Sequence, residues 1–223
     1  MAYIKIFITN LGKYNEGELV GKWIDLPCYD FEEQLEDIGG SNEPDENGQY
    51  YEEWFVTDYE TDIDGLEISE HPDIDELNDI AETIEGWDDN DEILAFGACL
   101  DFGFDISQAI SIVEDRDYMI FADCYNMTDV AKEYVSQIGD LENAVGWDKA
   151  RDYIDWESYI QDLSYDMDED SARAYAEEVE YSGDYDEEFI ESYFDWEAYG
   201  RDMEIEGNFV DMGNGVFVEI LRD

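Results

Sequence analysis

Carboxylates are the most abundant side chains in this chain that could take part in chemistry. The 223 residues include 64 Asp or Glu against 10 Lys or Arg, which gives a formal net charge of -54 at pH 7. The densest stretch, residues 73–92, reads DIDELNDIAETIEGWDDNDE and contains neither Lys nor Arg. Positions 23–115 together hold 31 acids and no Lys or Arg. Nucleic acids and anionic membranes need Lys and Arg for binding, so we expect neither as a ligand and infer that the partners are basic.

Calcium binding is the first chemistry to test, because acidic loops with Gly are typical of calcium sites. With Gly65 at the sixth position of an EF-hand loop, Glu60, Asp62 and Asp64 fall at ligand positions. The twelfth position is then His71 in place of the bidentate Glu, so we expect no calcium site. Carboxylate pairs for glycoside hydrolysis can be drawn at many places, so none is informative. An acidic enzyme that binds calcium or uses carboxylates remains an alternative.

Other catalytic and metal-binding signals are absent from the sequence. His71 is the only histidine, which excludes a two-histidine metal site. A Cys-His or Ser-His nucleophile pair is the alternative to the surface-loop or capping role that we expect for His71. Cys28, Cys99 and Cys124 form no C-x-x-C pair and are odd in number, which favours reduced, buried thiols. No apolar run is long enough to span a membrane, and the apolar start is too short for a signal peptide. We expect a cytoplasmic, soluble, non-enzymatic protein without metal, cofactor or catalytic residues.

The elements that must position the carboxylates begin with a β-β-α-β pattern. Apolar and polar residues alternate as in strands over 3–9, 19–26 and 51–59. Between the second and third strands, Asp30 and Glu33 have the spacing of a capping box, which predicts a helix from Asp30 to about Gly39.

The middle of the chain changes to a helical pattern. A helix that begins after Asp73, with Glu76 at the capping-box position, carries its apolar and acidic residues on opposite sides. Its apolar side consists of Ile74, Leu77, Ile80, Ala81 and Ile84. A second helix is expected over 91–103, and a third after Asp105, where Gln108 repeats the capping spacing.

The last region mixes strands and helices. We expect a strand over 117–123 and then a helix with Thr128 as its N-cap and Gly139 as its end. Asn214-Gly215 between alternating apolar residues predicts a β-hairpin near the C-terminus.

An internal repeat lies within this region. The segment YIDWESYIQDL at 153–163 returns as YFDWEAYGRDM at 193–203, an offset of 40 residues. Each copy has an acid-rich and mainly helical lead-in, so we infer a duplicated helical module at about 140–183.

These patterns predict an α+β fold with three domains. A small β-sheet plus helix domain is expected over 1–62, and a central helical bundle over 63–115. A C-terminal α+β domain with the inserted helical repeat is expected over 116–223.

An ordered anionic surface can act as a mimic of DNA. Duplex DNA carries about one charge per 1.7 Å of axis, and acids at i, i+3 and i+4 on a helix lie about 5 to 6 Å apart. A basic DNA-binding groove gains most of its affinity from phosphates, so carboxylates held at such spacing can occupy it. A solvated face, or a halophilic interaction module that needs acids for solubility in high salt, is the alternative interpretation. The predicted phosphate mimics are Glu32, Glu33, Glu36, Asp37, Asp58, Glu60, Asp62, Asp64, Asp75, Glu76, Asp79, Glu82, Glu85, Asp88, Asp89, Asp91, Glu92, Asp168, Glu169 and Asp170.

Residues 6–27, IFITNLGKYNEGELVGKWIDLP, resemble the ArdA family of antirestriction proteins. The pattern N-L-x-x-Y-N-x-G-x-L-x-G-x-W is matched at Asn10, Leu11, Tyr14, Asn15, Gly17, Leu19, Gly21 and Trp23. Similarity continues in YEEWFVTDYE at 51–60 and YFDWEAYGRDMEIEG at 193–207.

The resemblance implies an elongated, three-domain protein that forms a homodimer through its C-terminal region. It further implies mimicry of bent DNA and occupation of the DNA-binding groove of the methyltransferase core in type I restriction-modification enzymes. Such proteins are encoded on mobile genetic elements. The family's antirestriction motif is matched at Ala131, Tyr134, Val135 and Gly139. The usual Ile-Pro continuation of this motif is missing, and the additional forty-residue module is unusual for the family.

Overall fold

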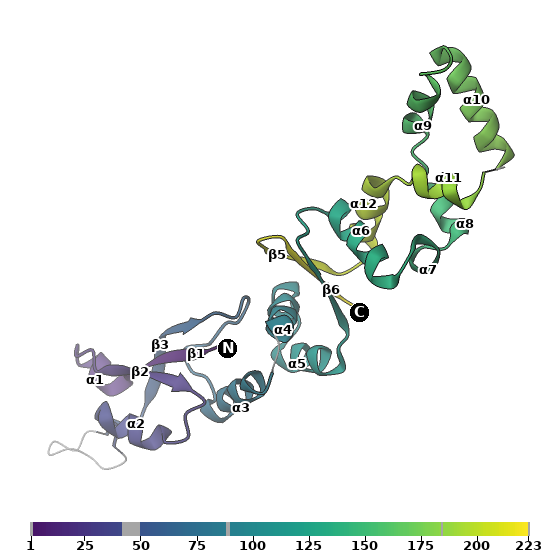
Figure 1. Cartoon of the computed structure of the whole chain (residues 1–223). Helices are drawn as coiled ribbons and strands as arrows, with labels where there is room; N and C mark the ends of the chain where they lie inside the picture. Colours follow the sequence, from purple (N-terminus) through teal and green to yellow (C-terminus); the bar gives the residue numbers. More distant parts are fainter. Residues whose placement is uncertain (1, 42–49, 88–89, 184, 223) are drawn as a thin grey trace. The chain divides into compact units, whose positions relative to one another are not determined.

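The computed structural model forms two compact units. It describes residues 2–41, 50–87, 90–183 and 185–222. Unit 1 extends to Tyr118 and includes Arg222, whereas unit 2 extends from Met119 to Leu221. Two three-stranded sheets are combined with many helices (Figure 1), so the predicted α+β class is confirmed. The finer division into three domains stays a prediction.

Unit 1 contains an antiparallel sheet with the strand order β2-β1-β3. The strands are β1 (Ile4–Asn10), β2 (Gly21–Leu26) and β3 (Trp54–Thr61). All three strands were expected, and their ends lie within three residues of the predicted ones. Alternation places Ile4, Ile6 and Ile8 of the central strand on one face of the sheet, where they are buried.

Two short helices accompany this sheet: α1 (Leu11–Asn15) and α2 (Phe31–Asp37). Helix α1 has no counterpart in the sequence-based expectations. Helix α2 was expected, but the predicted capping box between Asp30 and Glu33 is wrong. The Asp30 backbone is not extended (φ -109°, ψ 34°), and its side chain makes no cap hydrogen bond. Its carboxylate accepts a hydrogen bond from the Gln34 side chain at 2.8 Å.

Three longer helices complete unit 1: α3 (Ile74–Glu85), α4 (Asn90–Phe102) and α5 (Ile106–Asp115). Each confirms a predicted helix. The Asp73 carboxylate caps α3 and accepts from the backbone N–H groups of Asp75 at 2.9 Å and Glu76 at 3.3 Å. At α5, Asp105 and Gln108 form both hydrogen bonds of the predicted capping box, at 2.8 and 3.1 Å.

The second sheet has the strand order β4-β6-β5. Its strands are β4 (Tyr118–Ala122), β5 (Phe209–Gly213) and β6 (Val216–Ile220). The predicted hairpin between β5 and β6 is confirmed. Asn214 and Gly215 both have positive φ, 53° and 78°, as a tight turn matched to the twist of the strands requires.

Helix α6 (Met127–Ile138) follows β4 and ends at Gly139, as predicted. The expected cap at Thr128 is wrong, because Asn126 occupies that position with an extended backbone. The Asn126 side chain accepts from the backbone N–H of Asp129 at 3.0 Å. Asn and Thr two residues apart are both good caps, and here the helix begins early enough that Thr128 already lies inside it.

The remaining helical segments surround the repeat. They are α7 (Leu141–Ala144), α8 (Trp147–Ala150), the 3₁₀ segment η1 (Arg151–Tyr153), α9 (Trp156–Leu163), α10 (Glu169–Ser182), α11 (Glu187–Ser192) and α12 (Trp196–Glu206). Helix α12 packs against α6, and α9 packs against α10.

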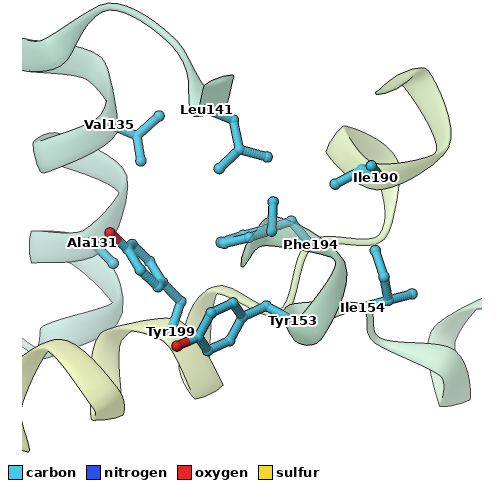
Figure 2. Packing of buried hydrophobic residues seen from close by; sticks show 9 residues of the cluster. Ala131, Val135, Leu141, Tyr153, Ile154, Ile190, Phe194 and Tyr199 are labelled. Atoms are coloured by element: carbon cyan, nitrogen blue, oxygen red, sulfur yellow. The ribbon is translucent and has the colours of Figure 1, made fainter. Parts of the chain in front are cut away.

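A hydrophobic cluster joins α6 to both copies of the repeat (Figure 2). Tyr153 and Ile154 come from the first copy, Phe194 and Tyr199 from the second, and all four are buried. An isolated antiparallel β-bridge links Ile154 with Phe194. The two copies are therefore neighbours in space and share one core.

Candidate functional site

Helix α3 carries the clearest array of acidic side chains. Leu77, Ile80, Ala81 and Ile84 are buried, which fixes the rotation of the helix about its axis. The carboxylates of Asp75, Glu76, Asp79, Glu82 and Glu85 are all exposed. In the described part of the chain, no ion pair joins any of these five to a Lys or Arg. They present an acidic helix face with its charges available to a partner.

The negative charge at the C-terminal half of α3 acts on a neighbouring tyrosine. The pKa of Tyr29 is raised, first by desolvation, then by the charge of Glu82 and a hydrogen bond to it, and last by the charge of Glu85. Tyr29 is itself 79% exposed, so it stays accessible beside these carboxylates.

Helix α2 contributes a second group of predicted phosphate mimics. Glu32, Glu33 and Glu36 are exposed. Asp37 differs from them, because its carboxylate pairs with the Lys22 ammonium at 2.8 Å. Lys22 therefore offsets part of the charge of this group.

Strand β3 and the turn after it hold a third group. Asp58, Glu60, Asp62 and Asp64 are all exposed. Asp62 accepts a hydrogen bond from the backbone N–H of Tyr3 at 2.9 Å, so its carboxylate helps to hold the N-terminal segment.

The start of α4 brings Asp91 and Glu92 into its first turn, where acids interact favourably with the helix dipole. Asp91 is exposed and Glu92 is half-buried. Asp88 and Asp89 lie outside the residues that the structure describes.

In unit 2 the predicted mimics lie at the beginning of α10. Asp168 caps this helix and accepts from the backbone N–H of Ser171 at 3.1 Å and from its hydroxyl at 2.8 Å. These hydrogen bonds lower the pKa of Asp168, so it keeps its charge in mildly acidic solution. Glu169 lies 3.9 Å from the Arg173 guanidinium, whereas Asp170 is exposed.

Further acids of unit 2 were not among the predicted mimics. Ala172 and Ala176 are the buried residues of α10, so its other sides face solvent. Exposed carboxylates there and on α11 are Glu177, Glu178, Glu180, Glu187 and Glu188. Their exposure on α10 follows from the four-residue spacing of the two alanines, which defines a narrow apolar stripe. They stay outside the predicted set of mimics and offer a charge-matched comparison with it.

The residues predicted to form the family's antirestriction motif are part of the core of unit 2. Ala131 and Val135 are buried at 0% and 8% exposure, and they face the cluster that contains both copies of the repeat (Figure 2). Tyr134 packs against the same cluster and is half-buried. Gly139 has φ 129°, a conformation that favours glycine, and it ends α6. In this chain Ala131 and Val135 pack α6 against Tyr199 of α12.

Among the described residues, no group of three or more His, Cys, Asp or Glu side chains lies close enough together to hold a metal ion. Glu60, Asp62 and Asp64, which were tested as calcium ligands on sequence grounds, lie at the end of β3 and in the turn after it. Over the same described ranges, no helix is both long and apolar enough to cross a bilayer.

The carboxylate arrays can accept hydrogen bonds and ion pairs from Lys and Arg of another protein. Comparison with protein families shows a match to the model described as antirestriction protein (ArdA), over residues 6–170 and 165–218. A comparison with curated proteins gives no significant match.

Proposed function

Because the chain belongs to the ArdA family of antirestriction proteins, we propose that it blocks restriction by occupying the DNA-binding groove of a type I restriction-modification enzyme. In this proposal its carboxylates stand in for DNA phosphates, and Lys and Arg of the methyltransferase core pair with them. The protein performs no catalysis, needs no cofactor and binds no nucleic acid. It acts in the cytoplasm after entry of a mobile genetic element, as a homodimer joined through the C-terminal region.

The observation that carries this proposal is the acidic face of α3. Five exposed carboxylates are held on a helix of 12 residues, which is about 18 Å long at about 1.5 Å per residue. Measured along the helix axis, there is therefore one carboxylate per about 3.6 Å. This is close to the roughly 3.4 Å of duplex axis per phosphate of one DNA strand. The buried apolar side of the helix keeps these charges in place, so a partner does not have to order them on binding.

The energy of such an interface is spread over many weak contacts. An exposed ion pair contributes roughly 0.2 to 1 kcal/mol, so no single carboxylate should be essential. The sum grows with the number of pairs and weakens with added salt, as it does for DNA itself.

The test is competition for the enzyme. A fluorescent duplex is bound to a purified type I methyltransferase core, and its release is followed by anisotropy as the protein is added. We expect complete release at near-equimolar protein. A duplex that stays bound in the presence of excess protein would contradict the proposal.

Variants locate the interface on the surface. The fourfold variant Asp75→Asn, Asp79→Asn, Glu82→Gln and Glu85→Gln should release the duplex at least tenfold less effectively, which requires a loss of about 1.4 kcal/mol. The matched control is Glu177→Gln, Glu178→Gln, Glu180→Gln and Glu187→Gln, which removes the same charge from α10 and α11. Equal losses in the two variants would show a response to net charge and would remove α3 from the site.

A further inference from the structure

The sheet of unit 1 has a second face that carries aromatic rings in place of a packed core. Its middle row crosses all three strands, because Phe7 of β1 pairs with Trp23 of β2 on one side and with Asp58 of β3 on the other. The Phe7 and Trp23 rings meet edge to face, with centroids 5.3 Å apart. The row therefore consists of two aromatic rings followed by a carboxylate.

A groove of about 710 Å³ lies over this row. Tyr14 and Leu19 are among its lining residues, and Glu70 adds a second carboxylate. The Tyr14 ring is held edge to face against Phe55 at 5.3 Å between centroids. A volume of this size is typical of sites that take a small molecule or a few residues of a peptide.

Three large side chains of the groove are exposed to solvent and are not packed in a core. Tyr14 is 51% exposed, Leu19 is 71% exposed and Trp23 is 41% exposed. All three are positions of the N-terminal family pattern, and the core on the opposite face of the sheet does not use them.

A glycine makes room for the floor of this groove. A Cβ atom at Gly21 would lie 2.6 Å from the Phe7 ring and 2.5 Å from the Ile8 carbonyl oxygen. Any larger residue would displace the Phe7 ring, so Gly21 is needed for the observed arrangement. Gly21 belongs to the same family pattern.

From these observations we infer that the groove binds an arginine side chain of the partner protein, stacked on the Trp23 and Tyr14 rings and hydrogen-bonded to Asp58 and Glu70. Guanidinium groups stack on aromatic faces and bind carboxylates through two parallel hydrogen bonds. An ammonium group can also lie over a ring, but it lacks the planar fork that makes the bidentate contact. The chain itself contains a related contact in unit 2, where the Arg151 guanidinium lies 5.0 Å from the centre of the Tyr185 ring.

Charge selects arginine over an apolar occupant. The two carboxylates within the groove lose hydration when it is filled, and a cation with N–H donors compensates for that loss, whereas an apolar occupant does not. The inference rests on the proposed function for its partner, a basic DNA-binding enzyme. The arginine would gain ring stacking in addition to ion pairs. A DNA backbone offers phosphates for ion pairs but no aromatic rings for stacking.

The experiment uses peptides and the full-length ¹⁵N-labelled protein, without any restriction enzyme. Acetyl-Gly-Arg-Gly-Arg-Gly-amide is titrated in 300 mM NaCl, and the same peptide with Lys or with the neutral analogue citrulline in place of Arg serves as comparison. We expect the Trp23 indole N–H signal to shift with the Arg peptide, with about fivefold tighter binding than for the Lys peptide and no binding of the citrulline peptide. Equal affinity for Arg and Lys, or shifts confined to other acidic surfaces, would overturn the inference.

Three variants assign the contact to the groove. Trp23→Thr keeps a residue suited to a strand, identifies the indole signal by its loss, and should weaken Arg binding about fivefold. The double variant Asp58→Asn with Glu70→Gln should also weaken Arg binding about fivefold. The control is Asp64→Asn with Glu67→Gln, which removes the same charge outside the groove. This control should change the affinity for the Arg peptide less than twofold. If Trp23→Thr fails to fold, the comparison of the Arg, Lys and citrulline peptides on the unmodified protein still tests the inference.

The same titration separates this inference from the proposed function. An absence of Arg preference leaves the duplex-competition result untouched, and failed competition leaves the peptide result untouched. Shifts of the Trp23 signal with protein concentration alone would assign the groove to a second copy of the chain and would overturn the arginine inference.

Discussion

Asp155 and Asp195 occupy the same position in the two copies of the internal repeat, and each donates its backbone N–H to the other copy. The Asp155 N–H donates to the Tyr193 carbonyl at 2.7 Å, and the Asp195 N–H donates to the Tyr153 carbonyl at 2.6 Å. Equivalent residues thus exchange equivalent hydrogen bonds, as across the interface of a symmetric dimer. The duplicated segments pair with each other inside one chain.

The same two aspartates also cap the helices that follow them. Asp155 accepts from the backbone N–H of Ser158 at 3.0 Å, and Asp195 accepts from that of Ala198 at 2.9 Å. Each aspartate therefore links the pairing of the copies to the start of α9 or α12.

Loss of one of these caps should lower stability measurably. Asp195→Ala removes the side-chain acceptor of α12 and should reduce the free energy of unfolding by about 1 kcal/mol. Urea unfolding followed by circular dichroism measures this change. The control is Asp166→Ala, an exposed acid of the same unit, for which a change within about 0.5 kcal/mol is expected; equal effects would argue against the cap.

The motif residue Val135 should matter for folding and not for contact with the partner. Val135→Ala removes two buried methyl groups from the cluster around Phe194 and should cost about 2 kcal/mol of unfolding free energy. Duplex competition, corrected for the folded fraction, should be unchanged. Lys132→Ala on the exposed side of α6 serves as the control, and normal stability with lost inhibition in Val135→Ala would contradict the structural role.

Charge removal on α3 should stabilise the protein while it weakens inhibition. Asp75, Asp79, Glu82 and Glu85 repel one another at i+3 and i+4 spacing, at about 0.2 to 0.5 kcal/mol for each pair. Their replacement by Asn and Gln should therefore raise the free energy of unfolding by about 1 kcal/mol. Glu85→Gln alone should also stabilise, because Glu85 ends the helix where negative charge opposes the dipole. A loss of stability in the fourfold variant would show that these acids have structural partners.

Glu219 should make stability depend on pH in a recognisable direction. Its Oε2 atom is buried without a hydrogen-bond partner in the described part of the chain, and desolvation raises its pKa above the ordinary value of 4.5. The folded state then binds the proton more tightly than the unfolded state, so stability is lost as pH rises from 4.5 through the folded-state pKa. Glu219→Gln should therefore stabilise the protein at pH 7, and this gain should vanish below pH 4.5. Unfolding of both proteins in urea between pH 4 and 7 measures the difference; a gain that is independent of pH would contradict this account.

Salt should stabilise the folded chain without being required for folding. The carboxylates behind its net charge of -54 repel one another more strongly in the compact state than in the unfolded chain. Added salt reduces this repulsion, because the Debye length falls from about 30 Å at 0.01 M to about 10 Å at 0.1 M. The melting temperature should rise over this range of NaCl and then level off. A protein that folds only in molar salt would instead support the halophilic interaction module.

Local patterns predicted the elements that depend on neighbouring residues. The reciprocal cap of Asp105 and Gln108 and the Asn214-Gly215 turn are confirmed, because each depends on backbone geometry within a few residues. The cap at Thr128 failed for a related reason, since two suitable residues stood close together and the sequence could not rank them.

The sequence by itself determined the charge of this protein and the separation of acidic from apolar residues along α3. Both follow from composition and from the fixed rotation per residue of a helix. Only the tertiary structure decided that Asp155 and Asp195 bind reciprocally and that Lys22 neutralises Asp37. It also decided that Trp23 stands exposed in the same cross-strand row as Asp58, with Phe7 between them. These relationships join residues far apart in the chain, and hydrophobic burial with strand pairing, which no local pattern encodes, brings such residues together.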